Sequence, residues 1–211
     1  MVIHKTPWLL KAFYSSLTWT GKASHQDKPC LYLTFDDGPI PSVTPWVADI
    51  LANYNAGATF FCVGDNIRKH PEEFELIQSQ GHRVANHTFH HVNGWSVPTE
   101  TYLREIKECD KVLRLDQNCQ QPLFRPPYGK ISRKQISEIN NSHRIIMWDV
   151  LSADYDHTIS PRKCLEATKK AAEPGSIVLF HDSYKAERNL KYVLPAFLDH
   201  FAAQGYLFKT L

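Results

Sequence analysis

Two adjacent aspartates, Asp36 and Asp37, end an apolar run of the chain, and a Gly38-Pro39 turn follows them. Within an extended strand neighbouring side chains face opposite ways, but where the chain turns at Gly38 both carboxylates can converge on one site. The alternative is an Asx-type turn, in which the acids only make local hydrogen bonds.

A second group of polar side chains contains His87 and His91, which lie four residues apart. On one helical turn both imidazoles share a face and supply two metal nitrogens. With Asp37 as a third ligand they form an open coordination shell for zinc or a similar divalent ion, with positions left for water and substrate. His90 is a spare ligand. The alternative is that these histidines lie at the surface or are hydrogen-bonded in the core.

Two further motifs, 125–129 and 177–182, bring an arginine and a histidine to the ends of apolar runs. Arg125 cannot act as a base, and its rigid fork of donors is suited to holding Asp36 ionised. The prolines after it fix a loop whose backbone N–H groups can face a developing oxyanion. His181 can give a proton to a leaving amine near neutral pH. The alternatives are a tight turn with a surface arginine and a capped core histidine.

The elements that must position these residues are β-rich runs alternating with helical stretches. This alternation predicts an α/β fold with a parallel sheet, either an open doubly wound sheet or a closed barrel. The seven expected strands cover residues 30–35, 58–63, 83–85, 123–125, 144–150, 176–180 and 206–209. The expected helices include 71–80, 98–115, one beginning at Ser160-Pro161, and 190–201. The four motifs follow strands at their carboxyl ends, where parallel α/β folds place their sites.

Residues 1–28 differ in kind from the domain that spans residues 29–211. They are expected to be an N-terminal extension with a short amphipathic helix packed on the barrel. The alternative is contact with a membrane surface or a partner, for which two flanking lysines are a weak signal. The apolar residues at helical spacing are Leu10, Phe13 or Tyr14, and Leu17, with Trp8 and Trp19 beside them.

Composition limits the classes of function. The chain has 211 residues and a net charge of +2, which suits one domain and lacks the basic excess that binds nucleic acid. No apolar run reaches the length of a membrane span and no cleavable signal is visible, which favours a cytoplasmic location slightly over the cell envelope. The five cysteines are odd in number and form no C-x-x-C pair, so buried free thiols are expected, with a Cys109–Cys119 bridge as the alternative.

The four motifs together resemble those of the polysaccharide deacetylases with a NodB homology domain, grouped as carbohydrate esterase family four. The resemblance covers residues 29–211 and implies a distorted (β/α) barrel with about seven strands, in agreement with the strand count above. The matching segments are 34–38, 87–91, 125–129 and 179–181.

The resemblance also implies the reaction and its residues. The reaction is removal of N-acetyl groups from an amino-sugar polymer of the peptidoglycan or chitooligosaccharide type, with release of acetate. The implied metal ligands are Asp37, His87 and His91, with zinc as the first choice and cobalt or nickel as alternatives. The implied catalytic residues are Asp36 as general base, Arg125 as its partner and His181 as general acid. The implied pocket residues are Tyr128, whose backbone N–H faces the oxyanion, Leu179 and Tyr155.

One family motif is altered. The pattern Asp-x-x-Asp-Trp aligns with residues 151–155, so Leu151 replaces the first acid and Tyr155 replaces the tryptophan. The resemblance assigns to that first acid the tuning of His181, because a carboxylate partner raises the pKa of a histidine and fixes its tautomer. Asp149 and Asp182 are the candidate replacements.

Two other functions compete with the deacetylase. One is metal-dependent hydrolysis of another C–N bond, in a cyclic amide or a ureide. A sugar-binding groove lined by exposed aromatic residues would argue against it, with Trp95 and Tyr155 as candidates. The other is a catalytically silent carbohydrate-binding protein, which has no need for a base, three metal ligands and an acid together. The oligomeric state stays open.

Overall fold

Strand β2 (Lys28–Asp36) is an interior strand of the sheet, and seven of its nine residues are buried. A strand covered on both faces reads as a continuous apolar run, as this one does. The computed structural model describes residues 3–114 and 121–211. In it, seven strands form a curled half-barrel in the order β6-β5-β4-β3-β2-β8-β7, and each neighbouring pair is parallel. The flanking strands are β3 (Ala58–Cys62), β4 (Arg83–Asn86), β5 (Leu123–Phe124), β6 (Arg144–Ile145), β7 (Val150–Leu151) and β8 (Ile177–His181).

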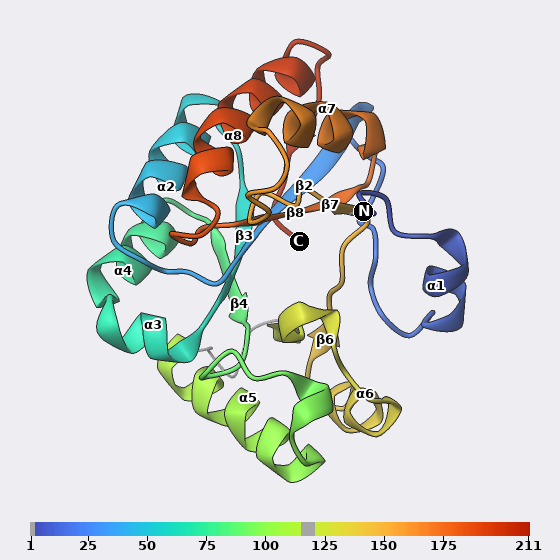
Figure 1. Ribbon diagram of the computed structural model, residues 1–211, viewed down its shortest axis with the longest axis vertical. Coiled ribbons are helices and arrows are strands. Elements are labelled where there is room, and N and C mark those ends of the chain that lie inside the picture. Colours follow the sequence, from blue (N-terminus) through green and yellow to red (C-terminus); the bar gives the residue numbers. More distant parts are fainter. Residues whose placement is uncertain (1–2, 115–120) are drawn as a thin grey trace.

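Helices cover the outside of this sheet (Figure 1). The helices expected over 71–80, 98–115 and 190–201 form, as does the one expected to begin at Ser160-Pro161. Ser160 caps this last helix through the Lys163 N–H, and Gly81 follows the first with a φ of 78°. Short strands β1 (Ser24–His25) and β9 (Leu207–Phe208) pair with β2 outside the main order. The longer helices are α2 (Val43–Asn53), α4 (Pro71–Ser79), α5 (Thr99–Leu113), α7 (Pro161–Ala171) and α8 (Glu187–Ala202), and the shorter ones are α3 (Gly64–Lys69) and α6 (Arg133–Ile139).

The single strand expected over 144–150 is wrong. The chain forms β6 and β7 instead, which follow each other in sequence but lie at opposite ends of the strand order. Between them the backbone crosses the opening of the half-barrel and pairs with the N-terminal segment. The Thr18 N–H donates to the carbonyl of Ile145 and its own carbonyl accepts from the Met147 N–H. Nearer the start of the chain, the Thr6 N–H donates to the carbonyl of Asp149. A local apolar pattern cannot show that one stretch serves both edges of a sheet.

The N-terminal segment therefore spans the gap between the two edge strands. Its anchors are Leu17 and Trp19, which are 6% and 7% exposed. Helix α1 (Trp8–Phe13) forms, but none of its residues is buried, so the expectation that this helix packs an apolar face on the barrel is not met. Residues on both sides of the helix anchor the segment, because Lys5 pairs with Val150 and Thr18 with Ile146, while the helix itself projects outward (Figure 1).

The cysteines in the described part of the chain form no disulfide bond. Cys30, Cys62, Cys109 and Cys164 are free thiols and all are buried. Cys119, and with it the alternative of a Cys109–Cys119 bridge, lies outside the described residues. Among the residues described, no helix has both the length and the apolar character needed to span a bilayer.

Candidate active site

Parallel register brings the sequence motifs to one edge of the sheet. Asp36 ends β2 and is paired with His181 at the end of β8 on one side and with Phe61 of β3 on the other. Asn86 ends β4, directly before the histidine motif, and is paired with Phe124, directly before Arg125. The carboxyl ends of these strands therefore carry all four motifs, at the edge where parallel α/β folds place their sites.

Asp36 is held by a buried arginine. The Arg125 Nη1 donates to Asp36 Oδ1 over 2.7 Å and to Thr34 Oγ1 over 2.8 Å. Its other nitrogens donate to the carbonyl oxygens of Ile146 and Met147, and its guanidinium lies 4.0 Å from the centroid of the Phe61 ring. Burial lowers the pKa of Arg125 and Asp36 opposes that shift, but a guanidinium stays charged in either case. The carboxylate thus has a fixed partner and a fixed orientation.

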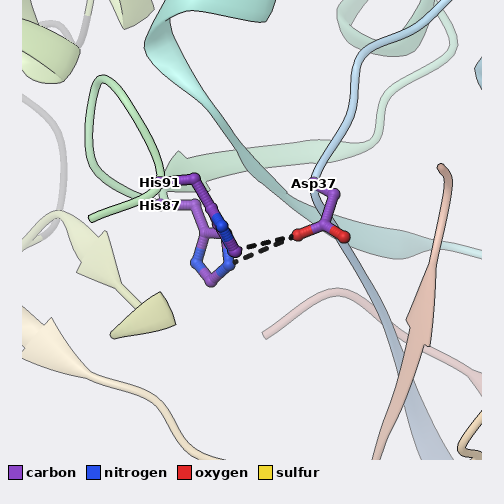
Figure 2. A group of neighbouring side chains, drawn as sticks. All are labelled: Asp37, His87 and His91. Atoms are coloured by element: carbon purple, nitrogen blue, oxygen red, sulfur yellow. Dashed lines mark ion pairs between the residues drawn. The ribbon is translucent and has the colours of Figure 1, made fainter. Parts of the chain in front are cut away.

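Asp37, His87 and His91 converge, as Figure 2 shows. The Nε2 atoms of His91 and His87 lie 3.2 Å and 3.8 Å from Asp37 Oδ1, and the three candidate ligand atoms all lie within 4.8 Å of one another. Ligand atoms placed tetrahedrally about 2.0 Å from a zinc ion would be about 3.3 Å apart. The spacing therefore fits a small divalent ion with two nitrogen ligands and one oxygen ligand.

The hydrogen bonds and the pKa values of these candidate ligands are also suited to binding a metal ion. His87 Nδ1 lies 2.8 Å from the carbonyl oxygen of Arg125, and since a carbonyl only accepts, Nδ1 carries the proton and Nε2 is free to bind a cation. Burial lowers the pKa of His87 to about 4, which keeps it neutral. Burial opposes ionisation of Asp37, but the hydrogen bond to His91 and the nearby histidines hold its pKa well below the usual range. Two imidazoles and one carboxylate are a ligand set suited to zinc.

The histidines do not lie on a helical turn, so that part of the prediction is wrong. The segment from His87 to His91 is an irregular loop in which Thr88 and His91 have φ angles of 64° and 55°. These left-handed residues fold the loop back until the two imidazole centroids are 5.0 Å apart. Such strain in non-glycine residues is concentrated at functional sites. His90 is not a ligand, because its ring points to Glu105.

His181 has a carboxylate partner, and it is Asp154. The Nδ1 of His181 lies 2.8 Å from Asp154 Oδ1, and the His181 backbone N–H donates to Oδ2. Burial would lower the pKa of His181, but Asp154 outweighs it and raises that pKa to about 9. The expectation that Leu151 replaces the tuning acid is therefore wrong, because the second acid of the motif makes the contact.

Neither of the proposed replacements reaches His181. Asp149 accepts hydrogen bonds from Lys5, Lys11 and Ser176. Asp182 accepts from the Gly38 N–H and from the hydroxyl of Thr44. Their roles are structural, on either side of the site.

The candidate metal ligands, Asp36 and His181 line one cavity of about 330 Å³. Asp36, Asp37, His87, His91 and His181 supply its polar wall. The expected pocket residues Tyr128, Leu179 and Tyr155 line it too, together with Trp148 and Leu151. The Tyr155 ring meets His181 edge-on at 5.0 Å, and the Tyr128 ring lies 4.6 Å from His91. Trp95 is 67% exposed and lies outside the lining.

Sequence reasoning missed Asp154 as the partner of His181, and it missed Trp148, Lys130 and Lys185 in the cavity wall. The signal for Asp154 was present, since it is the acid that the altered motif retains. Trp148 lies in the crossing between β6 and β7, which no periodicity reveals. The two lysines carry no local pattern.

Comparison with known proteins bears on the family and the fold. The family model for polysaccharide deacetylase matches residues 23–144. A chitooligosaccharide deacetylase of Azorhizobium caulinodans is 36% identical over 207 residues, covering 88% of this chain and 94% of that protein. A crystal structure of a peptidoglycan N-acetylglucosamine deacetylase superposes with a TM-score of 0.85 at 29% identity, covering 98% of this chain and 95% of the other.

The fold is also shared with a protein that is described as a pseudoenzyme. A CE4 family pseudoenzyme from Bacillus anthracis superposes with a TM-score of 0.78 at 22% identity, covering 92% of this chain and 66% of that one. Fold alone therefore says nothing of activity, which has to be argued from the site. The match to the family model and the identity with the chitooligosaccharide deacetylase settle the family: the chain belongs to the polysaccharide deacetylases.

Proposed function

We propose that this protein is a metal-dependent hydrolase that removes N-acetyl groups from an N-acetylated amino-sugar polymer or oligomer and releases acetate. The observation that carries the proposal is that the three candidate metal ligands, Asp36 and His181 converge in one cavity. Behind its wall, Arg125 is paired with Asp36 and Asp154 with His181. A binding protein has no need for these three together. The names of the similar proteins, which act on chitooligosaccharides and peptidoglycan, support a glycan substrate.

The metal ligands and the Asp36–Arg125 pair have separate tasks in the attack on the acetamide. A divalent ion held by Asp37, His87 and His91, with zinc as the best match, would supply a Lewis acid for the acetamide carbonyl and for a water molecule. Asp36 takes a proton from the attacking water, and the hydrogen bond from Arg125 holds this base in a fixed orientation. The backbone N–H of Tyr128 donates to the oxyanion that develops on the carbonyl.

The leaving group is handled on the other side of the cavity. His181 is protonated at neutral pH because its pKa is about 9, so it can give a proton to the sugar nitrogen as the C–N bond breaks. An unprotonated amine leaves poorly, which makes this step necessary. Leu179, Leu151 and Trp148 give the cavity an apolar wall that suits the acetyl methyl group. The products are acetate and a free amino sugar.

Acetate release from N-acetylglucosamine oligomers tests the proposal. Metal-stripped protein should be inactive and should recover with one equivalent of zinc, while Asp36→Asn should lower kcat at least a hundredfold, in the range of lost general-base catalysis. His181→Ala should also lower kcat. If zinc binds and no acetylated sugar is cleaved, the substrate is another amide. If no metal binds at all, the protein is a silent binder.

A further inference from the structure

Two lysines in the cavity wall have no part in the reaction described above. Lys130 and Lys185 both line the cavity that holds Asp36 and His181. Within the described ranges, neither has a carboxylate within ion-pair distance. Other lysines of this chain do have such partners: Lys5, Lys11, Lys69, Lys111, Lys169 and Lys191.

The two ammonium groups lie over aromatic rings instead. Lys130 Nζ is 5.6 Å from the centroid of Trp95 and 6.0 Å from that of Tyr128. Lys185 Nζ is 5.3 Å from the centroid of Tyr155. Since Tyr128 packs against His91 and Tyr155 against His181, one cation borders the ligand side of the cavity and the other borders the acid side.

The carboxylates inside the cavity do not need these cations. Asp36 is neutralised by Arg125, and Asp37 lies against His91. Glu187, the acid nearest to Lys185 in sequence, is paired with Lys191. The two positive charges are therefore free to act on an anionic group of the substrate, and the rings beneath them are surfaces on which sugar rings can pack.

We propose that Lys130 and Lys185 are specificity residues that bind a carboxylate carried by the glycan on or beside the acetamido sugar. The inference rests on the proposed function and narrows its substrate to an acidic amino-sugar polymer. A strand in which muramic acid, with its lactyl carboxylate, alternates with N-acetylglucosamine has this chemistry. A chitooligosaccharide is neutral and offers these lysines only hydroxyl and amide oxygens. Lysine is suited to the task as a compact point charge on a flexible stem.

The test compares kcat/KM for acetate release from two oligosaccharides of the same shape. One is a peptide-free N-acetylglucosamine–N-acetylmuramic acid tetrasaccharide with free carboxylates, and the other is the same compound with its carboxylates converted to primary amides. Zinc-loaded protein should prefer the acidic form about tenfold, since each exposed ion pair is worth roughly a threefold change. The preference should shrink between low and high salt, because salt screens exposed charges.

Lys130→Gln and Lys185→Gln should each lower the acidic-to-amide ratio about threefold, and the double variant should bring it close to one. Lys107→Gln is the matched control, because Lys107 is exposed on α5 and lies outside the cavity lining. It should keep the wild-type ratio. A wild-type ratio of one or less, or a double variant that keeps the preference, would overturn the inference and leave the deacetylase intact.

Failure of the proposed function gives a different result. If neither oligosaccharide releases acetate, calorimetric binding of the same two compounds to the full chain still decides the matter. Tighter binding of the acidic form that is lost in the double variant supports the role of the lysines. Equal binding of both forms, or a preference that survives in the double variant, rejects it.

Discussion

Asp154 determines how the proton on His181 behaves. The ring of His181 is nearly buried, which alone would keep it neutral, and the 2.8 Å contact with Asp154 reverses that effect. The same carboxylate fixes Nδ1 as the proton-bearing atom that faces away from the substrate. The other nitrogen, Nε2, is then the one that can donate to the leaving amine.

The contact between Asp154 and His181 predicts how kcat/KM depends on pH. Because the acid must be protonated, kcat/KM should fall as pH rises through about 9, the pKa of His181. In Asp154→Asn the His181 ring stays buried but loses its carboxylate partner, so its pKa falls and the falling limb should move to lower pH. Asp156→Asn is the control, since its carboxylate bonds Thr158 and not His181. An unchanged limb in Asp154→Asn would contradict the assigned role.

Arg125 should matter for stability as well as for activity. It is fully buried, and its removal leaves the Asp36 carboxylate buried without a partner. Arg125→Met should lower the free energy of unfolding by about 3–5 kcal/mol, measured by urea denaturation. Adding Asp36→Asn should recover part of that loss, because the unpaired charge is then absent. Strictly additive losses would show that the pair is not coupled.

At the scale of elements, the turn after β2 is held against the end of β8. The Gly38 N–H donates to Asp182 Oδ1 over 3.1 Å, and Thr44 at the start of α2 donates to Oδ2 over 2.6 Å. Burial raises the pKa of Asp182 to about 8. A Cβ on Gly38 would lie 2.0 Å from Asp182 Oδ2, so only glycine fits there. This packing fixes Asp37, the residue directly before the turn.

Gly38→Ala should therefore destabilise the fold by about 1–3 kcal/mol, the usual cost of overpacking, and should weaken zinc binding by displacing Asp37. Both effects can be measured on one sample by urea denaturation and by zinc titration. In an Asp182→Ala background the added methyl has room, so the further cost of Gly38→Ala should be smaller. An equal cost in both backgrounds would mean that the contact with Asp182 is not the cause.

The elements show what sequence patterns can and cannot predict. The strand ends that carry Asp36, His87, Arg125 and His181 were predictable, because each combines an apolar run with a polar turn. The loop that brings His87 to His91 was predicted as a helical turn, since spacing alone does not distinguish a helix from two left-handed residues. Asp154 was overlooked because the resemblance assigned the tuning of His181 to the first acid of the motif, the position that Leu151 occupies, while the contact is made by the second acid.

At the scale of the whole molecule, the half-barrel is completed by its own N-terminal segment. Residues from Lys5 to Thr18 bridge to the crossing between β6 and β7, where the sheet order leaves an opening. The crossing also supplies Met147, whose carbonyl accepts from Arg125, and Trp148 in the cavity wall. Sequence reasoning separated residues 1–28 from the domain, because contacts between the two ends of a sheet leave no local pattern.

The contacts of Asp149 with the N-terminal segment should make the stability of the fold depend on pH. Its carboxylate is fully buried and accepts from Lys5, Lys11 and Ser176. Burial opposes ionisation, but these partners together lower the pKa of Asp149, so its stabilising effect is present above the unfolded pKa and is lost as pH falls through the folded one.

Asp149→Asn should destabilise the protein at pH 7 by about 1–3 kcal/mol, because the lysines lose a charged acceptor. The difference from wild type, measured by thermal unfolding at several pH values, should narrow below about pH 4, where Asp149 of the unfolded chain begins to take up its proton while the folded carboxylate is still ionised. A difference that stays constant down to pH 2 would show that the charge of Asp149 is not what holds the segment.

The most direct test of the central claim is a time course of both products from an N-acetylated glucosamine oligomer with the zinc-loaded protein. Acetate and new primary amine should appear in equal amounts, and both should vanish in Asp36→Asn. Amine without acetate, or neither product from a protein that holds zinc at Asp37, His87 and His91, would contradict the account of this site as a deacetylase.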